Sequence, residues 1–275
     1  MPGDHARRDA VGVVHPVASR TARIVSLVPS LTELLFDLGL GAQVVGRTGF
    51  CIHPRDAVRS VPKLGGTKDV AVDRLLALAP THLVVNIDEN RRETVDALAR
   101  GVPHVVVTHP LVPDDNLSLY RMFGAIFDRG EQAEALAARY VTAREALRAA
   151  VAGVPDERVL YLIWRKPWYT VARSTYVSAM LDLARWRTLP AVSLPRYPTV
   201  ADDAPAWHEA ERILLSTEPY AFRQRDARTL AAALRRRGVG AAVTLIDGAM
   251  TSWYGSRAVA GLRYLAGLRR NVAAP

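Results

Sequence analysis

The stretch DRGEQAEALAARYVTAREALRAAV, residues 128–151, decides the fold of this chain. Its apolar side chains recur at the spacing of one helix face, and alanine fills most other positions. The larger members of that face are Leu136, Tyr140, Leu147 and Val151. Asp128 predicts an N-cap with Glu131 in capping-box spacing, and Gly153 and Pro155 predict the end of the helix. At 1.5 Å per residue, five or six turns of such a helix are about 30 Å long.

On each side of this helix lies a segment of about a hundred residues, a usual size for one domain, in which strands and helices alternate. The predicted strands are 23–28, 44–46, 82–85 and 104–107 before the helix, and 158–163, 212–215 and 242–246 after it. Alternation of this kind predicts parallel sheets with ligand-binding loops at the carboxyl ends of the strands. Because residues 23–25 correspond to 158–160, and 82–85 to 212–215, we predict a structural duplication.

The fold class that follows is α/β, with two Rossmann-like lobes joined by a long rigid interlobe helix and a ligand cleft between them. The predicted boundaries are a flexible N-terminal segment 1–22, an N-terminal α/β lobe 23–112, an interlobe helical segment 113–155 and a C-terminal α/β lobe 156–275.

Charge and composition restrict the partners. The chain has 275 residues, is 49% hydrophobic and carries a formal net charge of +9. Its arginines are spread along the chain, with the densest run at 235–237, and the sequence has no zinc-finger spacing or RNA-recognition motif. We therefore predict a solvated, arginine-rich surface, no nucleic-acid partner and a monomer. The single cysteine excludes an intramolecular disulfide.

The N-terminal residues 1–22 contain Arg7 and Arg8, but no apolar run of seven or more residues follows them. This pattern does not predict a signal peptide, and no later segment is apolar enough to insert into a membrane. The expected location is cytoplasmic. It becomes periplasmic or the cell surface if the start is misassigned or the chain is trimmed.

Aromatic residues gather in the loops that follow the strands of the second lobe. Turn chemistry favours Gly, Asn, Asp and Pro, so this enrichment points to a large, partly apolar ligand. The residues are Trp164, Trp168, Tyr169, Tyr220, Phe222, Trp253 and Tyr254. We predict that all except Phe222 contact the ligand.

Basic residues accompany these loops and predict a ligand that carries carboxylates or phosphates. The candidate anchors are Arg47, Lys68, Arg165 and Arg257. Cys51 and His53 are candidates for an axial position on the metal of a bound chelate, although two residues make an incomplete metal site. No intrinsic cofactor is expected.

No catalytic motif is present: GxSxG, HExxH and CxxC are all missing from the sequence. Residues 65–68, Gly-Gly-Thr-Lys, lack the spacing of a phosphate-binding loop. We predict a non-enzymatic binding protein. The alternative from another class is an enzyme with two Rossmann-like lobes that binds a nucleotide-linked substrate.

Three motifs of the first lobe, taken together, resemble a known family. They are RIVSLVPSLTEL at 23–34, VGR at 45–47 followed by VPKLGG at 61–66, and VDRLLALAP at 72–80. In this order they are similar to the class III, helical-backbone substrate-binding proteins that serve ABC importers of cobalamin, haem and ferric siderophores. The resemblance covers roughly residues 23–270. It is nearest to the cobalamin-binding branch and the helical backbone metal receptors.

The resemblance implies a transported ligand of the metal-chelate class: cobalamin or another corrinoid, haem or a ferric siderophore. It also implies an ABC permease dimer as partner, onto which one carboxylate of each lobe docks. By position these carboxylates are Asp73 and Asp203, where the family usually has Glu. A cytoplasmic copy would instead be a corrinoid or metal-chelate carrier or sensor without a permease.

Overall fold

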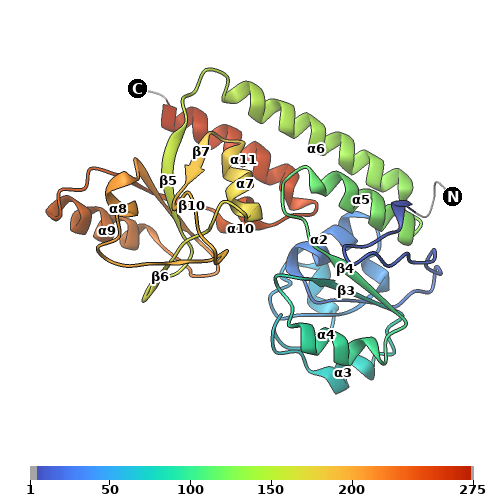
Figure 1. The fold of residues 1–275 in the computed structure, drawn as a ribbon. Coiled ribbons are helices and arrows are strands. Elements are labelled where there is room, and N and C mark those ends of the chain that lie inside the picture. Colours follow the sequence, from blue (N-terminus) through green and yellow to red (C-terminus); the bar gives the residue numbers. More distant parts are fainter. Residues whose placement is uncertain (1–4, 274–275) are drawn as a thin grey trace. The chain divides into compact units, whose positions relative to one another are not determined.

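The structure, a computed structural model, describes residues 5–273 (Figure 1). Its residues form two compact units, each described here by itself. Unit 1 contains Met1–Pro110, Asp114–Tyr140 and Tyr254–Arg257, and unit 2 contains Leu111–Pro113, Val141–Trp253 and Ala258–Pro275. The predicted α/β class is confirmed, because each unit is built on a parallel sheet covered by helices.

Unit 1 holds a four-stranded sheet whose neighbouring strands are all parallel. In spatial order the strands are β2 (Val44–Arg47), β1 (Ile24–Ser26), β3 (His82–Asn86) and β4 (His104–Thr108). Strands β1 and β3 are fully buried, as expected for the centre of a parallel sheet. The helices of this unit are α2 (Pro29–Asp37), α3 (Val72–Leu76), α4 (Arg92–Ala99) and α5 (Asp115–Ile126), with 3-10 turns at Gly41–Gln43 and Ala57–Ser60.

Unit 2 holds a second parallel sheet and a small antiparallel pair. The parallel strands are β10 (Ala242–Ile246), β9 (Arg212–Ser216), β5 (Glu157–Leu162) and β7 (Trp186–Thr188), and the pair is β6 (Trp168–Tyr169) with β8 (Thr199–Val200). The helices are α7 (Tyr176–Asp182), α8 (Ala206–Glu209), α9 (Gln224–Arg236), α10 (Gly248–Ser252) and α11 (Arg257–Ala273).

The two sheets have the same topology. If the strands of each sheet are numbered in chain order, both read 2-1-3-4 in space. Strand β1 therefore corresponds to β5 and β3 to β9, which confirms the predicted duplication. The sequence-based prediction missed β7, the fourth strand of unit 2. The segment Trp186–Thr188 has only three residues with an arginine in the middle, too short for a strand pattern to register.

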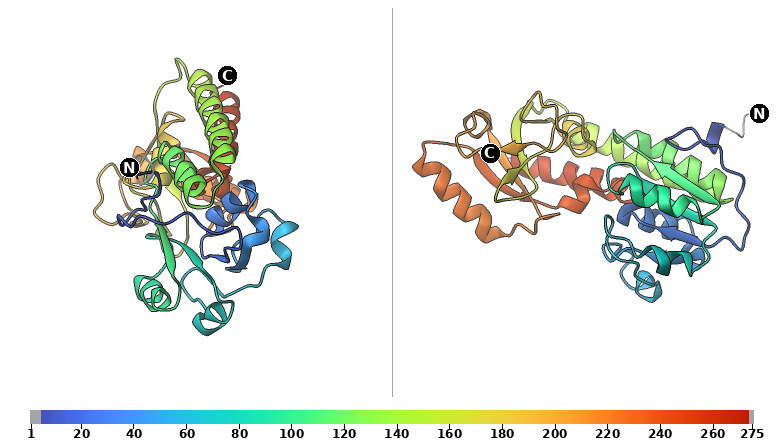
Figure 2. Two further views of the ribbon diagram at one scale, coloured as in Figure 1. Left: turned by 90° about the vertical axis from the view of Figure 1, so that its right-hand side faces the viewer. Right: turned by 60° about the horizontal axis from the view of Figure 1, so that its bottom comes forward.

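The long helix is α6 (Gly130–Ala150), with 21 residues, close to the predicted range. It begins two residues after Asp128, whose positive φ of 54° places it in the left-handed region before the helix. The part of α6 through Tyr140 belongs to unit 1 and the part from Val141 to unit 2. Within unit 2, that second part and the red helix α11 run side by side (Figures 1 and 2). No helix among the described residues has the length and apolar character needed to cross a membrane.

The N-terminal segment has a defined place in unit 1 over its described part, residues 5–22. The carboxylate of Asp9 is buried and accepts hydrogen bonds from His15 Nε2 (3.0 Å) and from the backbone N–H groups of Val13 (2.9 Å) and Val107 (3.2 Å). Burial raises the pKa of Asp9, but these hydrogen bonds outweigh burial and lower it below the usual 3.8. An ionised, fully bonded carboxylate therefore attaches this segment to β4.

A row of histidines continues from this attachment into the sheet of unit 1. The ring of His104 lies 6.4 Å from His15 and 4.8 Å from His82, and His82 also packs on Phe127 at 5.2 Å between ring centroids. Burial of His82, together with the nearby charges of His104 and His15, lowers its pKa from 6.5 to about 4. The folded protein therefore holds His82 neutral where the unfolded chain would protonate it.

This difference predicts an acid-sensitive stability. Between pH 6.5 and about 4 the unfolded chain binds a proton at His82 that the native state does not, so stability is full above pH 6.5 and falls as the pH drops towards 4. The loss amounts to about 3 kcal/mol, from 1.36 kcal/mol per pKa unit. The free energy of unfolding, measured with urea at several pH values, should fall less between pH 6.5 and 4 for His82→Phe than for the wild type. The exposed control His208→Gln should lose as much stability over this range as the wild type does. If both variants follow the wild type, His82 is not the group that causes the loss.

Two glycines of α11 give a second prediction. A Cβ on Gly261 would overlap the backbone oxygen of Met250 in α10, whereas a Cβ on Gly267 would meet no heavy atom within 4 Å. We expect Gly261→Ala to destabilise the protein by about 1–3 kcal/mol through overpacking. Gly267→Ala should instead stabilise it by up to about 1 kcal/mol through helix propensity. Thermal unfolding of the matched pair checks this, and equal shifts would contradict the close approach of α11 to α10.

Candidate functional site

The order 2-1-3-4 creates a switch point in each sheet, between the first and third strands, where the chain turns to opposite sides. Loops at the carboxyl ends of those two strands form the usual ligand position in an open α/β sheet. In unit 1 these loops follow β1 and β3, and in unit 2 they follow β5 and β9. The candidate functional site consists of these two sets of loops and their neighbours, each described within its own unit.

In unit 2 the switch-point loops bring together Trp164 and Arg165 after β5, and Tyr220 after β9. The Tyr220 N–H donates to the Ile163 carbonyl (3.3 Å), which ties the two loops together. Trp164 meets the ring of Tyr220 edge-on at 5.4 Å, and its exposed fraction is 42%. The guanidinium of Arg165 lies 5.6 Å from the centroid of the same ring. Three residues that the sequence predicted as ligand contacts therefore form one cluster.

Arg165 is also the cation of an ion pair. Its Nη1 lies 2.9 Å from Asp226 Oδ1 in the first turn of α9. A cavity of about 470 Å³ lies beside this pair, with a mainly apolar lining and four charged residues, Arg165, Lys166, Asp202 and Asp226. The further lining residues are Pro167, Trp168, Val200, Ala201, Leu215, Phe222, Thr229, Leu230 and Ala233.

The other aromatic residues of unit 2 have packing roles. Trp168 is half-buried, stacks on Phe222 at 6.2 Å and meets buried Trp207 edge-on at 5.6 Å. Tyr169 is half-buried in β6, and its N–H donates to the Trp164 carbonyl (3.2 Å). Both residues therefore support the loop that carries Trp164.

Trp253 is held by a carboxylate. Its Nε1 donates to Glu218 Oε1 (2.6 Å), which also accepts from the Ser252 hydroxyl (3.2 Å). Glu218 lies in the loop after β9, two residues before Tyr220, so this loop orients both aromatic side chains. Glu218 is a site residue that was not predicted from the sequence. An acidic residue beside a proline in a loop does not predict a hydrogen bond to a tryptophan distant in the sequence.

Tyr254 and Arg257 belong to unit 1 and not to the unit 2 loops with which the sequence grouped them. The Tyr254 hydroxyl donates to Glu89 Oε1 (2.5 Å), and Arg257 makes a bidentate pair with Glu33 (2.7 and 2.6 Å). Burial and the negative charge of Glu89 raise the pKa of Tyr254 well above 10. Both side chains are thus engaged in holding the segment 254–257 in unit 1.

Arg47 has a structural position. It is 3% exposed, and its guanidinium donates to the carbonyls of Val58 (2.9 Å), Cys51 (3.0 Å) and Thr48 (3.2 Å). These bonds hold the loop after β2 against the turn at Ala57–Ser60. A guanidinium with this burial and these partners does not face a ligand.

Cys51 is fully buried between two hydroxyl groups, those of Thr32 (3.0 Å) and Thr48 (3.1 Å). Burial raises the pKa of its thiol, so the thiolate that a metal requires is disfavoured. His53 is half-buried in the same loop. Within the described residues no group of three or more His, Cys, Asp or Glu side chains is placed to hold a metal ion.

The remaining predicted residues lie on the surface: Lys68 in the loop before α3, Asp73 in the first turn of α3, and Asp203 in the turn before α8. Unit 1 also exposes apolar side chains that the sequence analysis did not single out. Phe50 and Ile52 follow β2, and Ile87 follows β3, with exposed fractions of 63%, 51% and 47%. The available signal was the presence of apolar residues inside otherwise polar loops at strand ends.

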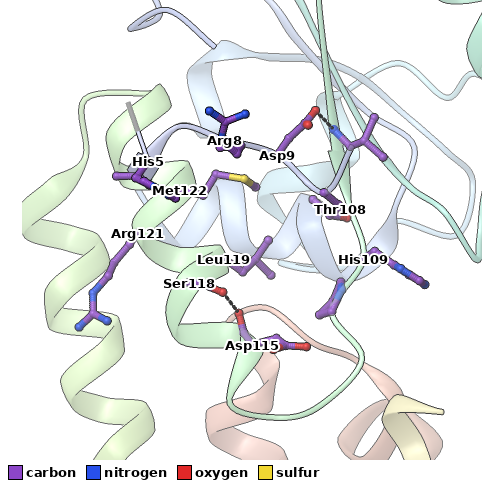
Figure 3. A pocket seen from close by; sticks show the side chains of 14 residues that line it. His5, Arg8, Asp9, Thr108, His109, Asp115, Ser118, Leu119, Arg121 and Met122 are labelled. Atoms are coloured by element: carbon purple, nitrogen blue, oxygen red, sulfur yellow. Dashed lines mark hydrogen bonds between the residues drawn. The ribbon is translucent and has the colours of Figure 1, made fainter. Parts of the chain in front are cut away.

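A separate cavity of about 600 Å³ in unit 1 contains none of the predicted site residues. Leu119 and Met122 of α5 form one side of it, and Arg8 and Asp9 of the N-terminal segment another (Figure 3). Arg8 donates to the Gly12 carbonyl (2.7 Å), and the Asp9 carboxylate is bonded to His15. Because these charges are used to hold the segment, we do not assign the ligand to this cavity.

A family model described as "Periplasmic binding protein" matches residues 24–232. The vitamin B12-binding protein of Yersinia pestis (strain Pestoides F) is 24% identical over 200 residues, which cover 72% of this chain and 71% of that protein.

Two solved structures share the fold. The periplasmic heme-binding protein RhuT from Roseiflexus sp. RS-1 superposes with a TM-score of 0.76 at 21% identity, over 92% of this chain and 99% of that one. The periplasmic vitamin B12-binding protein BtuF of Vibrio cholerae has a TM-score of 0.77 at 17% identity, over 92% and 98%.

The buried position of Arg47 predicts that its loss affects folding before binding. Arg47→Ala removes three charge-assisted hydrogen bonds and takes from the Cys51 carbonyl its side-chain donor, while the Val58 and Thr48 carbonyls keep the backbone N–H groups of Val61 and Cys51. We therefore expect a loss of about 3 kcal/mol in the free energy of unfolding. Lys68→Ala, at an exposed position that the sequence grouped with Arg47, should change it by less than about 0.5 kcal/mol. Urea unfolding measures both; a fully stable Arg47→Ala protein would show that Arg47 does not hold its loop.

Proposed function

We propose that this chain, which belongs to the periplasmic binding protein family, is the substrate-binding protein of an ABC importer and takes a metal chelate as its transported ligand. The chelate class is a corrinoid such as cobalamin, a haem or a ferric siderophore. Relatives named for vitamin B12 and for heme support this range. Similarity to these proteins favours a binding protein over the enzyme with two Rossmann-like lobes. A non-catalytic role is accordingly part of this proposal.

Family membership corrects the location that the sequence predicted. The cytoplasmic location is wrong, because the matching family consists of periplasmic binding proteins. The prediction rested on the missing hydrophobic segment among residues 1–22, and the family match outweighs that observation. The alternative of a cytosolic carrier or sensor without a permease fails for the same reason.

The observation that carries the ligand class is the exposure of large apolar side chains at the carboxyl ends of strands. Trp164 in unit 2 and Phe50, Ile52 and Ile87 in unit 1 all lie in such loops and are 42–63% exposed. Exposed apolar groups gathered at ligand-binding loops favour a large ligand with an apolar face. A tetrapyrrole-type chelate has such a face, and its peripheral carboxylates or amides suit hydrogen-bonding partners such as Arg165 and Lys68.

The metal in this proposal arrives with the ligand, held by the chelate itself. The buried thiol of Cys51 is not positioned to reach it, and His53 stays a candidate axial ligand. Asp73 and Asp203 are exposed, as docking onto basic side chains of a permease dimer requires, and we keep them as proposed docking residues. The cleft between the lobes and the monomeric state stay predictions.

Trp164 gives the direct test. We expect the wild type to retain cyanocobalamin or haemin through gel filtration with a shifted absorption band. Trp164→Ala should weaken binding by about tenfold, which corresponds to 1.4 kcal/mol of lost aromatic contact. Its melting temperature should stay close to the wild-type value, because 42% of the Trp164 surface is exposed.

Val141→Ala serves as the control, since Val141 is 49% exposed and lies in α6, away from the loops at the strand ends. It should bind the chelate like the wild type. Retention of neither chelate nor a ferric siderophore by the wild type would overturn the ligand class. Equal affinities of the Trp164 and Val141 variants would remove Trp164 from the site.

A further inference from the structure

The outer face of α9 in unit 2 carries a strip of arginines. Helix α9 spans Gln224–Arg236 and buries Ala227 and Leu234 against the unit 2 core. At about 100° per residue, its four exposed arginines fall within an arc of about 100° on the side away from these buried residues. They are Arg225, Arg228, Arg235 and Arg236, which we call the arginine face.

None of these four side chains has an ion-pair partner. In the part of the chain that the structure describes, no carboxylate lies within 4 Å of their guanidinium groups, although many other arginines are paired. The nearest acidic residue in sequence, Asp226, pairs with Arg165 and accepts from the Arg223 N–H. Arg235 Nε donates to the Ala231 carbonyl of the same helix (3.4 Å), which leaves its charge, like that of the other three, without a carboxylate among the described residues.

Helix stability does not account for the arrangement. Arg235 and Arg236 in the last turn suit the helix dipole, but Arg225 lies in the first turn, where a positive charge opposes it. Arg225 and Arg228 also stand at i,i+3 spacing, at which like charges repel. Because Arg225 destabilises the start of the helix, the arginine face is better explained by binding to a negatively charged partner than by helix stability.

The geometry points to a flat anionic partner, and we propose that the arginine face binds the anionic phospholipid headgroups of a membrane surface. From Arg225 to Arg236 the strip extends about 17 Å along a convex helix, which matches a plane better than a groove. The apolar side of α9 is used by the core of unit 2, so the contact is electrostatic, without insertion. Nucleic acid fits less well, because α9 has no aromatic residue to stack on bases and the family acts outside the cytoplasm.

Such a contact would concentrate the protein at the membrane that contains an importer. The inference does not depend on which chelate is carried, and its test uses no ligand. Because only headgroup attraction is involved, binding should be weak at physiological salt and steeply salt-dependent.

Co-sedimentation of the full chain with phosphatidylglycerol–phosphatidylcholine vesicles tests the proposal. At low salt we expect clear partitioning that falls as salt rises, and little partitioning to pure phosphatidylcholine. Each single change (Arg225→Gln, Arg228→Gln, Arg235→Gln or Arg236→Gln) should reduce the partition coefficient by about fivefold, and replacement of all four by about six hundredfold.

The control is a second quadruple variant, which removes the same charge from four exposed arginines of unit 1: Arg20→Gln, Arg55→Gln, Arg100→Gln and Arg139→Gln. It should keep most of the binding. An equal loss in both variants would show that only net charge matters and would overturn the assignment to α9. The assignment of a lipid partner is wrong if the wild type does not partition to the vesicles, or if an equal charge of soluble RNA displaces it from them completely. Both outcomes are measured on the wild type, so they are decisive even if the quadruple variant is unstable.

Discussion

Unit 1 depends on Gly255, whose backbone N–H and carbonyl groups are both hydrogen-bonded to side chains of helix α5. Its N–H donates to Asn116 Oδ1 (2.7 Å), and its carbonyl accepts from the Tyr120 hydroxyl (2.8 Å). Its positive φ of 73° is a conformation that L side chains rarely adopt, and an added Cβ would lie only 3.1 Å from the Ser30 carbonyl oxygen, so this position favours glycine. A residue more than a hundred positions from α5 is thereby fixed in the centre of unit 1.

The neighbours of Gly255 extend this constraint to the loops. Tyr254 holds Glu89 in the loop after β3, and Arg257 holds Glu33 in α2. Both contacts are buried or nearly so, where charge-assisted hydrogen bonds are strong. The switch-point loop of unit 1 is therefore positioned by a segment from the far end of the chain. In unit 2 the comparable loops are held by local contacts, Trp253 with Glu218 and Arg165 with Asp226.

Arginine has three physical roles in this protein. Arg47 is buried and holds backbone carbonyls, and Arg165 and Arg257 form ion pairs inside their units. The arginines of α9 face solvent without a paired carboxylate. Residues expected to anchor a ligand, such as Arg47 and Arg257, thus mainly stabilise loops, whereas four of the arginines behind the net charge of +9 share one face of α9 and have no paired carboxylate among the described residues. Only the surroundings of each guanidinium separate these roles, since the residue type is the same.

The sequence by itself determined the α/β class, the helix of residues 130–150, most strands and the duplicated order. Hydrophobic periodicity and chain-local signals such as Gly and Pro carry this information. Part of the candidate site was also predictable, because Trp164, Arg165 and Tyr220 follow buried strands and parallel strands end at one edge.

The tertiary structure alone decided which predicted residues are engaged elsewhere. Burial turned Arg47 and Cys51 into loop supports, packing on Trp207 drew Trp168 into the core, and the return of residues 254–257 moved Tyr254 and Arg257 into unit 1. The strand at Trp186–Thr188 was likewise fixed by its pairing with β5. These contacts join residues that are distant in the sequence. A local sequence pattern cannot predict them, because it contains no information about which distant side chains the fold brings together.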